Sequence, residues 1–206
     1  MAGGLRQRQL ALDVSKLPQV TFAARSITWW GTIGMMAIEG GVFALVIASY
    51  FYLRSRTDHW PPTEAPPDLL WGSINTAVFV LSLAPTEWYR RRAHKGDLRA
   101  VRLGLVIASM IGVANLAIRY LEMKHLNCNW SGDAYGSVVW LLIGLHITHL
   151  LTDWVETLVL TVLLFTSELV EGKRFVDAEE NASYWYFVVI TWIPIYLVLY
   201  WAPRWL

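Results

Sequence analysis

Cysteine and charge are both scarce in this sequence of 206 residues. It holds one cysteine, Cys128, and charged residues make up only 16% of the chain. A single thiol excludes an internal disulfide framework and a cysteine-rich metal site. The formal net charge of +1 gives no indication of nucleic-acid binding, and we expect no nucleic-acid partner. The polar first twenty residues lack the apolar segment of a secretory signal, so we interpret residues 1–26 as a tail outside the membrane.

Apolar residues, by contrast, are abundant. Hydrophobic residues make up 55% of the chain and include 12 tryptophans, a composition typical of a membrane protein. A hydrocarbon core of roughly 30 Å requires about 20 mostly apolar residues in a helix, and its backbone polar groups need internal partners. We therefore predict an all-α polytopic membrane protein. Its single domain over residues 27–206 is a bundle of five transmembrane helices at about 27–53, 69–89, 98–121, 136–166 and 183–202.

Lysine and arginine are distributed unevenly between the two sides of the predicted bundle. Twelve lie on the side of the N-terminus, including those in RRRAHKGDLRAVR, and four lie on the other side. Positive charge favours the cytoplasmic side of a membrane, so we expect a cytoplasmic N-terminus and a C-terminus outside. Aromatic residues at the predicted helix ends are expected to form an interfacial belt: Trp29, Trp30, Tyr50, Tyr52, Trp88, Tyr89, Tyr200 and Trp201.

Four ionisable residues lie in the predicted fourth span, in the segment LLIGLHITHLLTDWVETLVL. Spacings of three, four and three residues separate His146, His149, Asp153 and Glu156. Such steps return to one face of a helix. Ionisable residues inside a membrane are costly and persist where they have a partner, a cavity or a task. We therefore regard all four as buried polar or proton-linked candidates.

Glu39 is a fifth candidate, near the middle of the first predicted span. Gly40 and Gly41 follow it and allow another helix to approach closely. Glu39 and His149 are predicted at a similar depth, so we expect a contact among Glu39, His146 and His149. Two interpretations stay open for the glutamate: a proton-relay or regulatory carboxyl, and a carboxylic acid hydrogen-bonded to a neighbouring helix.

A metal site is the weaker interpretation of the paired histidines. A bis-histidine haem needs ligands on opposite faces of its ring, and a carboxylate-bridged di-metal site needs E-x-x-H motifs on facing helices. The remaining histidines, His59, His94 and His125, lie in predicted loops or at span ends. We therefore predict no metal ligands and no catalytic residues in this chain.

Asn115, Arg119 and Glu122 form a second polar stripe, on the predicted third span. Arg119 lies near the outer end of that span, where three interpretations are open. It can pair with Glu122 three residues later, extend to the membrane surface, or bind a lipid phosphate. The ion pair is the interpretation that we favour.

A series of motifs follows the chain from about residue 30 to residue 201: IEGGVFALVIASYFYLRS, HWPP, INTAVFVLS, HKGDLRA, YLEMKH, DAYGSVVWLLIGLHITHL and ENASYWYFVVITWIPIYLVLYW. This ordered set resembles subunit III of the haem-copper oxidases, in particular of cytochrome c oxidase, in its five-helix bacterial form. The resemblance places Glu39 at the family's buried glutamate. Together with the polar stripe of the third span, the motifs give five candidates for lipid binding or helix packing: Arg119, Glu122, Trp60, Tyr135 and Trp185.

The resemblance implies a non-catalytic subunit that binds no cofactor itself, with haem and copper in partner subunits. It implies direct contact with subunit I, an assembly with subunit II and further small subunits, and bound phospholipid. The implied location is the bacterial cytoplasmic membrane, and the implied role is to sustain subunit I and its proton uptake. Asp153 and Glu156 depart from the family, which usually has small or apolar residues there, so their role stays open.

Two alternatives remain at this point. One is subunit III of a quinol oxidase or a relative associated with nitric oxide reductase. The other, of a different class, is a stand-alone transporter or proton channel, which buried acids favour. No predicted span is broken in its middle to form a substrate site, which argues against the transporter.

Overall fold

The computed structural model describes residues 21–62, 65–166 and 172–205 of the chain. Five helices are long and apolar enough to cross a membrane, and the described residues form no strand, which confirms the predicted fold class. The first four are α1 (Ile27–Arg54), α2 (Leu69–Ala93), α3 (Leu98–Lys124) and α4 (Ala134–Thr166). The fifth span comprises α5 (Lys173–Tyr196), a π-helical turn η2 (Leu197–Trp201) and α6 (Ala202–Trp205).

The last helix begins earlier than the sequence indicated. α5 starts at Lys173, whereas the predicted span starts at residue 183, because the charged segment before it resembles a loop. Two polar residues of that segment, Glu179 and Asn181, are in fact buried in the bundle. The Glu179 carboxylate lies 3.0 Å from Nε2 of His94, and the Asn181 amide donates to Thr157 Oγ1 at 2.9 Å. These partners compensate for the polarity and allow the helix to extend.

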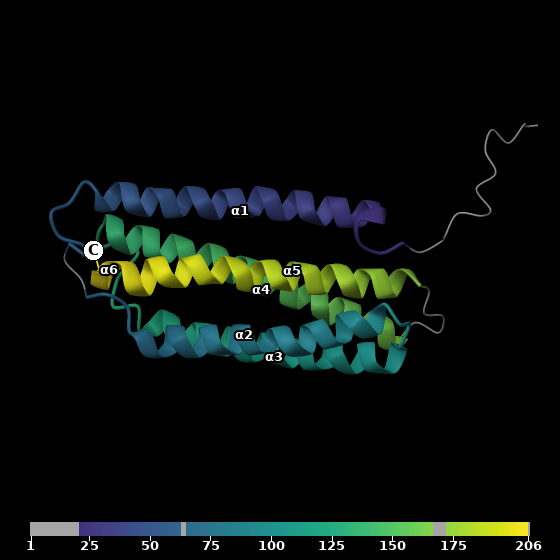
Figure 1. Cartoon of the computed structure of the whole chain (residues 1–206). Coiled ribbons are helices and arrows are strands. Elements are labelled where there is room, and N and C mark those ends of the chain that lie inside the picture. The colour runs from purple at the N-terminus through teal and green to yellow at the C-terminus, as the bar shows by residue number, and fades with distance from the viewer. Residues whose placement is uncertain (1–20, 63–64, 167–171, 206) are drawn as a thin grey trace, which may run out of the picture.

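The helices lie side by side, with α1 on the outside of the bundle (Figure 1). α2 packs against α3 and α5, α3 also packs against α4, and α1 packs mainly against α4 and α5. α1 contributes little to the interior: of its described side chains, Phe43 and Tyr50 are the buried ones. Most of its surface therefore faces lipid or another protein.

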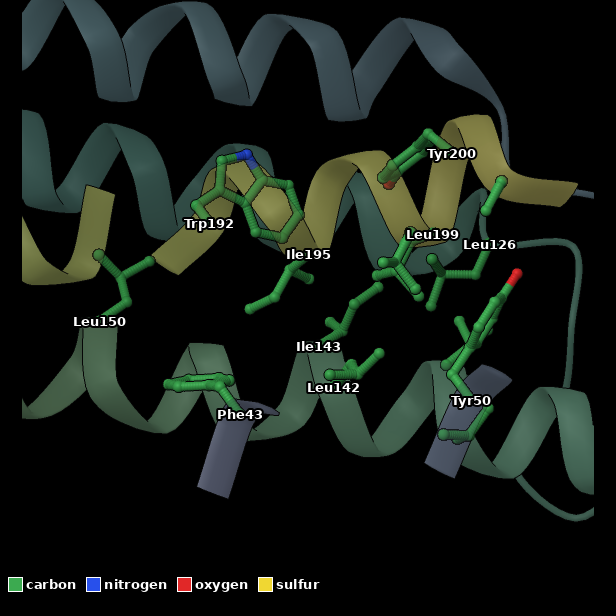
Figure 2. Packing of buried hydrophobic residues seen from close by; sticks show 14 of the residues in the cluster. Phe43, Tyr50, Leu126, Leu142, Ile143, Leu150, Trp192, Ile195, Leu199 and Tyr200 are labelled. Atoms are coloured by element: carbon green, nitrogen blue, oxygen red, sulfur yellow. The ribbon is translucent and has the colours of Figure 1, made fainter. Parts of the chain in front are cut away.

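The apolar interior is formed mainly by α4 and the fifth span. Figure 2 shows Leu142, Ile143 and Leu150 of α4 facing Trp192, Ile195 and Leu199, with Phe43 and Tyr50 of α1 beside them. A short connection over residues 94–97 joins α2 to α3. At the α2–α3 turn, Gly96 adopts a positive φ of 68°, and the carboxylate of Asp97 accepts a hydrogen bond from the amide of Ala100 at 3.2 Å.

Two glycines determine how closely helices approach. A Cβ on Gly72 of α2 would lie 2.4 Å from Cζ of Tyr200, and one on Gly112 of α3 would lie 2.3 Å from Cδ1 of Trp154. Both distances are shorter than non-bonded carbons tolerate. The absent side chain at position 72 thus leaves room for the ring that carries the Tyr200 hydroxyl into the bundle.

The positions of the chain ends agree with an odd number of membrane spans. The N-terminal end of α1 and the C-terminal end of the chain lie at opposite ends of the bundle (Figure 1). Residues 1–20 of the predicted tail lie outside the described residues. The assignment of the N-terminal end to the cytoplasm stays a prediction.

Candidate functional site

A buried ion pair forms the centre of the polar interior. Arg119 and Glu122 lie three residues apart on α3, and a guanidinium nitrogen is 2.8 Å from Oε2 of Glu122. Each side chain is only 1% exposed. Arg119 therefore neither extends to the surface nor offers its charge to a lipid phosphate, and the pair that we favoured is the arrangement found. Side chains of two other helices donate hydrogen bonds to the Glu122 carboxylate: the Asn75 amide at 2.9 Å and the Tyr200 hydroxyl at 2.5 Å.

The guanidinium of Arg119 also links α3 to α4 and α5. Its second terminal nitrogen lies 3.1 Å from Nδ1 of His146, and its central carbon lies 3.9 Å from the ring centroid of Trp192. Nε2 of His146 lies 3.0 Å from the carbonyl oxygen of Val188. The neutral imidazole with its proton on Nε2 satisfies both contacts, since Nδ1 then accepts from Arg119 and Nε2 donates to the carbonyl. The positive charge is stabilised by an acid, an imidazole and an indole face.

His146 therefore does not take part in the contact that we expected with Glu39. His146 and His149 are three residues apart, and three residues of an α-helix fall about 60° short of a full turn. That angle is enough to direct His146 between α3 and α5 and His149 toward α1. The spacing correctly placed both histidines on one side of α4, but that side is wide enough to contact more than one neighbouring helix.

Glu39 and His149 do meet, between α1 and α4. Nε2 of His149 is 3.6 Å from Oε1 of Glu39, which is too long for a direct hydrogen bond but within the range of an ion pair. The Tyr184 hydroxyl of α5 donates to the other carboxylate oxygen at 2.9 Å. Nδ1 of His149 donates to the carbonyl of Leu145 at 2.6 Å, which leaves Nε2 facing the acid.

The Glu39 site is only partly covered by the chain. The side chains of Glu39 and His149 are 24% and 11% exposed. Glu39 thus combines a histidine partner with partial exposure.

Asp153 and Glu156, the other half of the predicted stripe, face different surroundings. Asp153 is 1% exposed and points into the bundle, and within the described ranges its Oδ1 atom has no hydrogen-bond partner. Glu156 is exposed and lines an open pocket with Arg174, Asp177 and Glu180. The four residues of the stripe therefore do not form one site. Among the residues that the structure describes, no three His, Cys, Asp or Glu side chains are grouped so that they could hold a metal ion.

The aromatic candidates are buried in contacts between helices. The ring of Trp60 lies edge-on to Tyr50 at 5.2 Å and to Tyr135 at 5.1 Å, so it holds the loop after α1 against α1 and α4. The indole N–H of Trp185 donates to Ser82 Oγ at 2.8 Å and ties α5 to α2. These positions are consistent with a role in packing, and lipid binding by them stays a prediction.

The sequence predicted the wrong location for three tyrosines that lie inside the bundle. Tyr50, Tyr89 and Tyr200 were expected in an interfacial belt, but each is at most 1% exposed and lies inside the bundle. Aromatic position near a helix end cannot distinguish a ring that points to the headgroups from one that points inward. The inward position of Tyr200 follows from its hydrogen bond to Glu122, the carboxylate that Asn75 also contacts. This contact can be recognised only once α2, α3 and the fifth span are packed together.

The fold and these contacts define a polytopic helical membrane protein whose central charges are neutralised within the chain. A family model for cytochrome c oxidase subunit III matches residues 56–204. The chain belongs to the cytochrome c oxidase subunit III family. This assignment confirms the resemblance seen in the sequence motifs.

Individual relatives agree with the family. The chain is 29% identical to a probable cytochrome c oxidase subunit 3 of Nocardia farcinica, over 82% of this chain and 85% of the relative. It has the same identity and coverage with a probable cytochrome c oxidase subunit 3 of Mycobacterium tuberculosis. A cytochrome c oxidase subunit 3 of Pylaiella littoralis is 27% identical over 69% of this chain, and the match spans 53% of that longer protein.

Proposed function

We propose that this chain is a non-catalytic subunit of a haem-copper terminal oxidase in aerobic respiration, where it packs directly against subunit I. Subunit II and further small subunits would complete the assembly, in the cytoplasmic membrane of a bacterium. Membership of the subunit III family and the names of the relatives support this assignment. In this proposal the haem and copper belong to the partner subunits.

The structural role is supported by one observation: the central charges are paired inside the bundle, while the outer face of α1 is apolar. The central charges, Arg119 and Glu122, are paired inside the chain. Meanwhile α1 presents a row of exposed apolar side chains that includes Ile27, Ile38 and Leu45. A subunit built in this way can cover a neighbouring membrane subunit or hold lipid without bringing an unpaired charge into the interface.

Support for proton uptake is the proposed task of the Glu39 site. A proton exchanged between Glu39 and His149 would leave the net charge of the pair unchanged, and both side chains are partly exposed. A proton held there would be available to an adjacent subunit without ionising an isolated group in the membrane. Bound phospholipid is expected on the same apolar faces.

The electron donor that we propose is cytochrome c, in keeping with the names of the relatives. A quinol oxidase is the alternative within the same class. Neighbouring reading frames distinguish the two. A subunit II with a copper-binding sequence supports cytochrome c, and a subunit II without one supports quinol.

Purification in mild detergent tests the assignment. An affinity tag on this chain should bring down a subunit I that carries haem, with a Soret band in the complex. Purification of the chain as a stable, functional unit on its own would support a transporter or channel instead. The separated chain should show no Soret band, and a band lost on His146→Ala and His149→Ala would overturn the assignment of haem to the partners.

A further inference from the structure

A small cavity with several polar side chains in its lining lies between the helices, away from the Glu39 site. It is lined by α2, α3, α4 and α5, and we call it the Asp153 chamber after the carboxyl in its lining. Its polar lining comprises Asp153 together with Ser82, Thr86, Tyr89, Thr157 and Asn181. The cavity volume is about 10 Å³, and a space of about 10–15 Å³ is what one water molecule requires.

The Asp153 carboxyl is the unsatisfied group of this chamber. Its side chain is 1% exposed, and Oδ1 accepts no hydrogen bond within the described part of the chain. No ion pair of Asp153 is present among the described residues either, and the nearby charge that acts on it is the like charge of Glu156. An isolated carboxylate in such an interior costs several kcal/mol. The buried acid therefore needs a partner that the protein side chains do not supply.

Titratable groups near Asp153 come from three helices. α2 contributes Tyr89 and α5 contributes Tyr184, while Glu156 lies on the same helix as Asp153. The part of α3 that faces the cavity is formed by Ala108, Ile111 and Gly112, none of which titrates. His149, one turn before Asp153 on α4, pairs with Glu39 of α1 instead. The other neighbours named here are acids or neutral groups, so none of them forms an ion pair with Asp153.

A metal cation does not fit the chamber, because its oxygen atoms already accept hydrogen bonds. Oδ1 of Asn181 accepts from the Tyr89 hydroxyl at 3.1 Å, and Thr157 Oγ1 accepts from the Asn181 amide at 2.9 Å. Ser82 Oγ accepts from the indole of Trp185 at 2.8 Å. Hard cations such as Ca²⁺ and Mg²⁺ require about six oxygen ligands. One free carboxyl and a space for one water molecule cannot provide them.

We propose that the Asp153 chamber is a proton-binding site, in which Asp153 carries a proton and a single water molecule bridges its carboxyl to the surrounding hydroxyls. The proton removes the charge and turns the carboxyl into a hydrogen-bond donor for the water. The hydroxyls of Thr86 and Thr157 line the same cavity and provide further contacts for the water. The site explains why a carboxyl, rather than a small apolar residue, occupies position 153.

This site is separate from the Glu39–His149 pair. Asp153 follows His149 by four residues, a rise of about 6 Å along α4. Glu39 meets His149 on the α1 side, whereas the Asp153 chamber is lined by the other four long helices. The proposal depends on Asp153 and its cavity alone, and it stands or falls independently of the subunit assignment.

Infrared spectroscopy of the full chain, purified in mild detergent with whatever partners it retains, tests the proposal, with aspartate isotopically labelled at its side-chain carboxyl carbon. We expect a protonated-carboxyl C=O band that shifts on transfer to D₂O, is lost in Asp153→Asn and is retained in Glu156→Gln. The asparagine is nearly isosteric, and the glutamine changes an exposed carboxyl one turn away. Loss of ionised-carboxylate bands alone in Asp153→Asn would overturn the proposal.

A second variant tests the water and does not depend on the assembly of Asp153→Asn. Thr86→Val keeps the shape of a side chain whose hydroxyl donates to its own helix, to the carbonyl of Ser82 at 2.9 Å. We expect this variant to keep the Asp153 band and to shift its frequency, because the water loses a neighbour. A band that stays at the same frequency would contradict a water bridge between the carboxyl and Thr86.

Discussion

The guanidinium of Arg119 and the carboxylate of Glu122 form an ion pair 2.8 Å apart inside the bundle, with both side chains 1% exposed. Asn75 and Tyr200 donate to the same carboxylate, so the pair joins α3 to α2 and to the fifth span. A charge pair inside a membrane protein is tolerated when its remaining hydrogen-bonding capacity is satisfied. The stability of the whole bundle should therefore be sensitive to either partner.

Arg119→Leu should destabilise the bundle because it leaves the Glu122 carboxylate buried without its cation. Removing one partner of a buried pair costs about 3–5 kcal/mol. We expect a lower midpoint of thermal unfolding in detergent and less chain in the assembled complex. Arg91→Leu is the control, since the Arg91 side chain is 74% exposed and should change little. Equal midpoints for the two variants would contradict a stabilising pair.

Gly72→Ala should push the Tyr200 ring away from α2. The new Cβ would lie 2.4 Å from Cζ of Tyr200, and overpacking of an interior costs about 1–3 kcal/mol. We expect a lower unfolding midpoint for this variant. Gly31→Ala is the matched control, because a Cβ at that position of α1 would meet no other part of the structure within 4 Å beyond its own helix backbone and chain neighbours. Unchanged stability of Gly72→Ala would mean that the ring does not lie against the glycine.

Trp60→Ala should loosen the loop after α1. The indole ring lies edge-on to Tyr50 and Tyr135, and truncating a buried tryptophan costs about 3–5 kcal/mol. Limited proteolysis should cut the region between α1 and α2 faster in this variant. Trp130→Ala, at a tryptophan that is 68% exposed, should leave the cleavage rate unchanged. Equal rates in the two variants would rule out the anchoring role.

Glu39→Gln should leave assembly largely intact, because the amide keeps the shape of the side chain and can still accept from Tyr184. The variant cannot share a proton with His149, so we expect an altered rate of proton uptake or a shorter lifetime during turnover. Both are measured on the complex over many turnovers. Tyr184→Phe serves as a comparison, since it removes one hydrogen bond and keeps the acid. Normal kinetics of Glu39→Gln throughout would leave Glu39 with a structural role alone.

The sequence predicted contacts best where both partners lie on one helix or share a depth. The spacing of Arg119 and Glu122 indicated their ion pair, and the similar depth of Glu39 and His149 indicated their contact. It predicted contacts poorly where the rotation of a helix about its axis decides which neighbouring helix a side chain faces. His146 turns toward Arg119 although it shares a stripe with His149, and a difference of about 60° around one helix cannot be read without its neighbours.

Polar residues near the ends of spans were the other source of error. Glu179 and Asn181 resembled loop residues, and Tyr200 resembled an interfacial aromatic, yet all three are buried. Hydropathy counts each side chain as if it faced lipid or water. It cannot register the partners, here His94, Thr157 and Glu122, that remove the cost of burial.

The sequence by itself determined the class of this protein. Its long apolar segments had to be helices, because a helix satisfies all backbone N–H and C=O groups within one segment of a bilayer. It also determined the family, because the order of its motifs is specific. The tertiary structure decided which polar groups meet. It separated one stripe of α4 into His146 beside Arg119, His149 beside Glu39, Asp153 in its chamber and an exposed Glu156. The physical reason is that each of these environments is formed by other helices, whose rotation and packing no single span encodes.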